Sequence, residues 1–124
     1  MSHRDAELAA LLDGERLGIS DLQAFHVALD EKKGFDLDMI RNIAYLVGEL
    51  GEVVHAARHF QRQNGQPTEL EAREHLGEEL ADCLAYLLKL ANYAGIDLQA
   101  AYVEKMRRNI SRTWPTRTTG GSES

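Results

Sequence analysis

The sequence predicts an all-α fold in which four helices form an antiparallel bundle, and the bundle is expected to assemble into an oligomer. Apolar residues recur at helical spacing in several long segments, and short turns rich in Gly, Asp or Pro separate these segments. No segment longer than a few residues alternates as a β-strand does. A chain of 124 residues, 44% of them hydrophobic and only two of them proline, has the size of one small helical domain. Helices joined by such short turns typically pack as antiparallel neighbours.

Each of the first two expected helices begins at a residue that can cap it. Ser20 precedes the periodic segment DLQAFHVALDEKK, and its hydroxyl can accept from the first free N–H groups of a helix. Gly34 is expected to stop this helix, because glycine readily adopts the left-handed conformation found at helix ends. The second helix is expected to begin at Asp36 or Asp38 and to run to about Gln63.

The second half of the chain predicts two further helices. A turn over residues 64–67 (NGQP) precedes Thr68, which is expected to cap a third helix that ends at Gly95. Asp97 is expected to cap a fourth helix, LQAAYVEKMRRNISR, which ends before Pro115. These four helices define an expected domain over residues 20–115.

Both ends of the chain are expected to lie outside this domain. Residues 1–19 form a variable N-terminal segment, in which residues 6–12 can make a short helix before Asp13 and Gly14. Residues 116–124 (TRTTGGSES) contain no apolar anchor and are expected to be a disordered tail.

Composition narrows the classes of partner. A net charge of −6 argues against binding to a nucleic-acid backbone or to an anionic membrane surface. No apolar run approaches the roughly 20 residues of a membrane span, and no signal peptide is recognisable at the start. The single cysteine, Cys83, cannot form an internal disulfide and is expected to be a small core residue. A cytoplasmic protein is therefore the expectation.

Two pairs of acidic residues stand out because they lie among Leu, Val and Ala. Glu49 and Glu52 form one pair and Glu79 and Asp82 the other, each with the i, i+3 spacing of one helix face. The two pairs have the same angular relation to their own apolar arcs, so an antiparallel hairpin can point both into one groove. Four carboxylates beside a core need a compensating positive charge, and an oxygen-only set favours Mg²⁺ or Mn²⁺. The alternative is a solvated acidic helix edge.

The apolar arcs next to these pairs are expected to be the buried faces of their helices. Their members are Ile43, Val47, Leu50, Val54 and Ala57 on the first segment, and Leu76, Leu80, Leu84, Leu87 and Ala91 on the second. On the second segment the apolar residues spread too widely around the helix for one neighbour to cover them. This breadth is the reason for expecting an oligomer.

Other residues are candidates for contacting a substrate. Lys105, Asn109 and Arg112 share one face of the last helix and suit phosphate oxygens, although cations near a helix C-terminus are favoured by the dipole anyway. Tyr86 lies on the stripe of Asp82, and Tyr45, like Asn42, on that of Glu49. Such aromatic rings can stack on a base, or simply pack against the neighbouring helix. Trp114 can cover a pocket or hold the C-terminal segment in place.

Several other chemistries find little or no support. Glu52 and His55 form the Glu-x-x-His of a di-iron bundle, but the partner segment offers Glu79 and Asp82 without a histidine. There is no Ser/His/Asp arrangement, no CxxC, no glycine-rich phosphate loop and no dinucleotide fingerprint. Side-chain nucleophilic catalysis therefore has no candidate, whereas metal-assisted hydrolysis does.

The combined motifs resemble the MazG-like, all-α nucleoside triphosphate pyrophosphohydrolases, and most closely the dCTP pyrophosphatase-like branch. The resemblance covers residues 20–115 and is carried by GELGE at 48–52, EELAD at 78–82 and YLLKLANYAGIDL at 86–98. It also includes Lys105, Asn109 and Arg112 at their spacing, followed by Trp114 and Pro115. Either acidic pair alone would be much less specific than this combination.

The resemblance implies a Mg²⁺-dependent enzyme that cleaves nucleoside triphosphates between the α and β phosphates and so cleanses the nucleotide pool. The implied metal ligands are Glu49, Glu52, Glu79 and Asp82, with Glu49 or Glu52 also catalytic. The implied phosphate contacts are Lys105, Asn109 and Arg112, and Tyr86 is our further candidate for binding the substrate because of its place beside Asp82. Members of the family work as dimers or tetramers in which a second subunit can contact the nucleotide.

Two features depart from the family pattern. Many members have a double glutamate where this chain has Gly48 before Glu49, although the dCTP pyrophosphatase-like branch also has glycine there. The tryptophans that often wall the base pocket are absent, and Phe25 and Phe60 are the nearest aromatic residues. The alternative function is a non-catalytic, oligomeric binding module that keeps the fold. Phosphoribosyl-ATP pyrophosphohydrolase shares the carboxylate pattern but fits the C-terminal segment less well.

Overall fold

A computed structural model describes residues 2–112 of the chain, and all regular structure in this part is helical. Five helices follow one another: α1 (His3–Ala10), α2 (Ile19–Lys33), α3 (Met39–Arg62), α4 (Glu69–Tyr93) and α5 (Leu98–Ile110). The predicted all-α class is confirmed. Trp114 and the expected tail over residues 116–124 lie outside the described residues.

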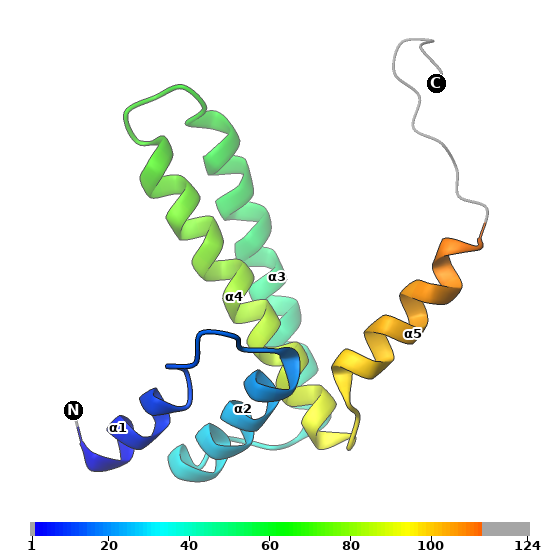
Figure 1. Ribbon diagram of the computed structural model, residues 1–124. Helices are drawn as coiled ribbons and strands as arrows, with labels where there is room; N and C mark the ends of the chain where they lie inside the picture. Colours follow the sequence, from blue (N-terminus) through cyan, green and yellow to red (C-terminus); the bar gives the residue numbers. More distant parts are fainter. Residues whose placement is uncertain (1, 113–124) are drawn as a thin grey trace.

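The long helices α3 and α4 form an antiparallel hairpin around which the other helices are arranged (Figure 1). Asp38 caps α3 as expected, since its carboxylate accepts from the Arg41 backbone N–H at 2.8 Å. The expected turn joins the helices, and Gly65 has the left-handed φ of 77° that the reversal requires. Thr68 precedes α4, but its hydroxyl donates to the Gln63 side chain and makes no capping hydrogen bond.

The other expected helix ends are largely confirmed, with one correction. Gly34 ends α2 with a φ of 66°, and Asp97 caps α5 by accepting from the Ala100 N–H at 3.0 Å. The prediction that Ser20 caps α2 is wrong: the helix begins at Ile19 after Gly18. Asp21 explains the shift, because its carboxylate accepts from the Gly18 N–H at 2.8 Å and so ties down the turn before Ser20.

One stripe of each long helix faces the other helix, and its spacing alternates between three and four residues. We call this pair of stripes the inner seam. Its buried and half-buried members are Asn42, Leu46, Glu49, Val53, Ala56 and Phe60 on α3, and Ala72, Leu76, Glu79, Cys83, Tyr86 and Leu90 on α4. Small side chains at several of these positions let the two helices approach closely. Two acidic side chains therefore lie within the contact between the helices.

The arcs expected to be buried lie mostly on a different face. Ile43, Val47, Leu50 and Val54 of α3 are 40–62% exposed, and Leu80, Leu84 and Leu87 of α4 are 40–52% exposed. These seven residues, which we call the outer stripe, also recur at three- and four-residue spacing. The expectation that they are buried within the chain is wrong, because the inner seam occupies the contact between α3 and α4.

Helix α2 packs across the C-terminal half of α4. The buried Gln23 fixes this contact, since its side-chain amide donates to Asn92 Oδ1 at 3.1 Å and its backbone carbonyl accepts from the Asn92 amide at 2.9 Å. Helix α1 attaches to α2 through the buried Leu8 and through the ion pairs Lys32–Glu7 and Lys33–Asp5.

Helix α5 leaves the hairpin at an angle and contacts α2 rather than running along α3 and α4 (Figure 1). The described helices of one chain therefore do not close into an antiparallel four-helix bundle. None of these helices combines the length and apolar character needed to cross a membrane.

Candidate active site

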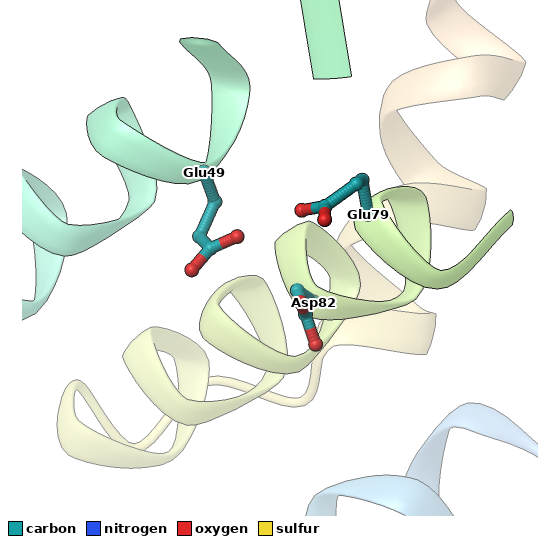
Figure 2. Close-up of side chains that lie close together, drawn as sticks. All are labelled: Glu49, Glu79 and Asp82. Carbon is teal, nitrogen blue, oxygen red and sulfur yellow. The ribbon is translucent and has the colours of Figure 1, made fainter. Parts of the chain in front are cut away.

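Three carboxylates meet midway along the hairpin. Glu49 projects from α3, and Glu79 and Asp82 project from α4, one turn apart (Figure 2). One oxygen of each side chain lies within 4.8 Å of those of the other two. We call these residues the acidic trio. Glu49 and Glu79 belong to the inner seam, so hairpin formation itself brings the trio together.

The trio concentrates negative charge at a partly buried site. The pKa of Glu49 is raised, first by burial and then by the neighbouring charges of Asp82 and Glu79. Within residues 2–112, the ion-pair partner found for the trio is His75, whose Nε2 lies 3.8 Å from a Glu79 oxygen. A neutral imidazole would not compensate for three carboxylates.

A divalent cation would provide the missing compensation, and the residues present fit a hard ion. All three side chains offer oxygen atoms, which Mg²⁺ and Mn²⁺ prefer to nitrogen or sulfur. Mg²⁺ usually keeps part of its hydration shell and completes its coordination with substrate phosphates. Glu49, Glu79 and Asp82 are therefore the side chains that could hold it.

Glu52 was expected to belong to the same set, but the structure does not group it with the trio. Its side chain is exposed on α3, one turn after Glu49. Glu52 nevertheless lies close enough for its charge to contribute to the raised pKa of Glu49. The four predicted acids thus divide into three grouped carboxylates and one at their edge.

Tyr86 lies beside the trio, as its spacing from Asp82 predicts. Burial raises the pKa of its hydroxyl, and the negative charge of Glu49 raises it further. Its ring is 6.2 Å from that of Tyr45, centroid to centroid, so one tyrosine from each long helix extends the site along the hairpin.

The three predicted phosphate contacts lie on the diverging helix or just after it. Lys105 is exposed on α5, and the Arg112 guanidinium donates to the Asn109 amide oxygen at 3.4 Å. Because α5 points away from the hairpin, the structure does not bring these residues to the trio of their own chain (Figure 1).

Two residues near the site, His75 and Lys89, were not among the candidates from the sequence. His75 is four residues before Glu79 on α4, a spacing that would have placed it next to the trio. Lys89 is buried, and no sequence pattern predicts the burial of a lysine at this position. The di-iron interpretation gains no support, because the metal-type group found among residues 2–112 holds carboxylates and no histidine.

A known protein family matches the part of the chain that holds the acidic trio. The MazG nucleotide pyrophosphohydrolase domain matches residues 37–114, which is more than half of the chain. The chain belongs to this family. The match spans α3, α4 and α5, and therefore includes the acidic trio, Glu52 and the three predicted phosphate contacts. Family membership supports a hydrolase that acts on nucleotides. A search of curated proteins gave no match.

Proposed function

We propose that the protein is a Mg²⁺-dependent nucleoside triphosphate pyrophosphohydrolase that cleaves between the α and β phosphates. The products are the nucleoside monophosphate and pyrophosphate, and the proposed role is to cleanse the nucleotide pool in the cytoplasm. The acidic trio carries this proposal, because it is a partly buried, all-oxygen donor set, and within residues 2–112 no lysine or arginine is found paired with it. The acidity of the chain makes a nucleic-acid partner or a membrane surface unsuitable.

The side chains of the site divide the work. Glu49, Glu79 and Asp82 hold the Mg²⁺, or Mn²⁺, which when bound would polarise phosphate oxygens and make a water more acidic. Glu52 is exposed at the edge of the trio, and there it is suited to orienting the attacking water. Glu49 remains the second candidate for this role, since its raised pKa favours proton uptake. Tyr86 contacts the nucleoside side of the substrate.

A second copy of the chain completes the site in this proposal. The outer stripe is continuous with an apolar cavity of about 690 Å³ whose lining includes Ile43, Leu84, Leu87 and Tyr102. A second hairpin packed against this face would bury the stripe and close a four-helix bundle from two chains. Helix α5 of the second copy, together with the residues just after it, could then bring Lys105, Asn109 and Arg112 to the triphosphate. Either a homodimer or a homotetramer satisfies this arrangement.

Release of pyrophosphate from a panel of canonical and damaged ribo- and deoxyribonucleoside triphosphates tests the proposal. The reactions are run with Mg²⁺, with Mn²⁺ and with EDTA. We expect metal-dependent release, with one or two bases preferred and no orthophosphate formed. If the folded, metal-loaded protein releases no pyrophosphate from any nucleotide, the alternative of a non-catalytic binding module is favoured, and Gly48 becomes the departure to explain.

A further inference from the structure

A small pocket extends the acidic site toward the end of the hairpin at which α2 packs. It has a volume of about 200 Å³ and is lined by Phe35, Asp36, Asn42, Tyr45, Tyr86 and Lys89. Tyr45 is one turn before Glu49 on α3, and Tyr86 is one turn after Asp82 on α4. A molecule anchored on the trio therefore has this pocket within reach.

Lys89 is the unusual residue of this pocket. Its side chain is only 11% exposed, and its ammonium lies 3.3 Å from a carboxylate oxygen of Asp30, itself 5% exposed. Tyr93 donates to the other Asp30 oxygen at 2.8 Å, which fixes the carboxylate. Burying an ammonium group is costly even when it is paired, and core packing alone would be served equally well by a methionine or a leucine.

The aromatic contacts of Lys89 place the ammonium at the pocket. Its Nζ lies 5.3 Å from the ring centroid of Phe35 and 5.2 Å from that of Tyr86, and both rings line the cavity. The contact with the nearer Asp30 oxygen lacks hydrogen-bond geometry. The N–H groups of Lys89 can therefore donate to an acceptor that enters the pocket.

The charges around Lys89 decide which part of a nucleotide fits. Asp30 forms an ion pair with it, and Asp36 lies close enough for Lys89 to contribute to lowering the Asp36 pKa to about 2. Arg41 is the main cause of that low pKa and pairs with Asp36 at 2.6 Å. The two cations, Lys89 and Arg41, are each paired with one of these carboxylates, so the pocket does not carry the net positive charge that a phosphate requires. Its aromatic walls suit a flat, neutral ring instead.

We propose that Lys89 is a specificity-determining residue that donates a hydrogen bond to an acceptor atom on the edge of the substrate nucleobase. The base lies against Tyr45, Tyr86 and Phe35, and the triphosphate extends over the acidic trio. A pocket of about 200 Å³ is smaller than the 300–1,000 Å³ typical of whole-ligand sites, so it holds the base and not the whole nucleotide. This inference rests on the proposed nucleotide substrate.

The test compares a nucleotide with its base-free counterpart. The double variant Asp30→Asn with Lys89→Met removes both buried charges together, and Lys32→Met is the matched control on the far side of α2. For each protein, kcat/KM is measured for the preferred nucleoside triphosphate and for abasic deoxyribose 5′-triphosphate. Affinities for the nucleoside monophosphate and for abasic deoxyribose 5′-monophosphate are measured by calorimetry.

We expect the double variant to lose about tenfold or more in kcat/KM on the nucleotide, the loss typical of a hydrogen bond to a charged donor. Its activity on the abasic triphosphate, and all activities of Lys32→Met, should not change. Equal losses on both substrates, or no loss on either, would overturn the inference. If the double variant does not fold, Tyr45→Leu replaces it, because this substitution alters a half-exposed wall of the pocket. It should give the same loss on the nucleotide and none on the abasic triphosphate. Equal losses on the two substrates would again overturn the inference.

These measurements separate the two proposals. If the wild-type protein hydrolyses no nucleotide, the proposed function fails, and the monophosphate affinities still test the role of Lys89. A tenfold loss for the nucleoside monophosphate alone would support the pocket, whereas equal affinities for the base-bearing and abasic ligands would exclude it. If the wild-type protein is active and the variants lose nothing that depends on the base, only the inference about Lys89 fails.

Discussion

The inner seam and the outer stripe of the hairpin have the same spacing but opposite environments. The inner seam mixes large apolar side chains with small and polar ones, and its most deeply buried members include Ala56 and Ala72 at 1% and 2% exposure. The outer stripe consists of large aliphatic residues, yet Val47 is 62% exposed. Hydrophobicity alone would have assigned the two faces the other way round. The difference shows that apolar area alone does not determine which face the chain uses for its own hairpin.

Each face then has a distinct task. The inner seam places Glu49 opposite Glu79 and so assembles the acidic trio. The outer stripe leaves its apolar area for another surface, which in our proposal belongs to a second copy. The following predictions test this division, beginning with the largest expected effect.

Replacing a carboxylate of the acidic trio should almost abolish turnover. Glu49→Gln or Asp82→Asn removes one proposed metal ligand while keeping the shape of the side chain, so pyrophosphate release should fall by about 10²-fold or more, beyond the loss typical of outer-shell partners. Circular dichroism should show unchanged helicity. Glu78→Gln, at a neighbouring side chain that is 77% exposed, is the control and should retain activity. Full activity in either ligand variant would refute the site.

A charge on the outer stripe should separate the copies without unfolding the chain. Val47→Asp is tolerated in a single chain because the side chain is exposed, but it would bury two carboxylates in a symmetric interface, at several kcal/mol each. Light scattering coupled to size-exclusion chromatography should show monomers, and pyrophosphate release should fall with assembly. Val27→Asp on α2, 52% exposed, is the matched control. If Val47→Asp still forms an active assembly with the mass of the wild-type protein, the second copy does not pack on the outer stripe.

Overpacking the inner seam should reduce stability. Ala56→Leu adds a branched side chain where the helices are in contact, which should lower the free energy of unfolding by about 1–3 kcal/mol. Denaturant titration measures this loss directly. Ala44→Leu, at an exposed position of α3, should change stability much less. Equal effects of the two substitutions would mean that the seam is not tightly packed.

Acidification should relieve the repulsion inside the metal-free trio. The pKa of Glu49 is raised in the folded chain, so the folded state binds a proton more tightly than the unfolded state. Stability should therefore rise as the pH falls from neutral through the raised pKa, and this contribution should be absent in Glu49→Gln. Thermal melts in EDTA across this pH range compare the two proteins. Added Mg²⁺ should bind less well as the pH falls, because the proton and the metal ion compete for Glu49.

The sequence predicted those features that depend on local chemistry. Asp38, Gly34 and Asp97 mark helix ends through hydrogen bonds or conformations that involve only near neighbours. The grouping of Glu49 with Glu79 and Asp82 followed from helical phase. Helical phase did not predict which of the two stripes lies between the helices, because the stripes have equal spacing and the outcome depends on how closely the two helices approach. The exclusion of Glu52 from the trio and the burial of Lys89 are likewise set by packing.

The divergence of α5 has a consequence for how activity depends on the amount of protein. In our proposal, the phosphate contacts of one chain serve the carboxylates of another. Catalysis would then obey mass action: on dilution below the dissociation constant of the assembly, specific activity would fall although every chain remained folded. An isolated chain would carry the carboxylates of one site and the phosphate contacts of another, so neither site would be complete. Mixing a chain inactivated at Asp82 with one inactivated at Arg112 would restore some turnover, because one of the mixed sites would again be complete.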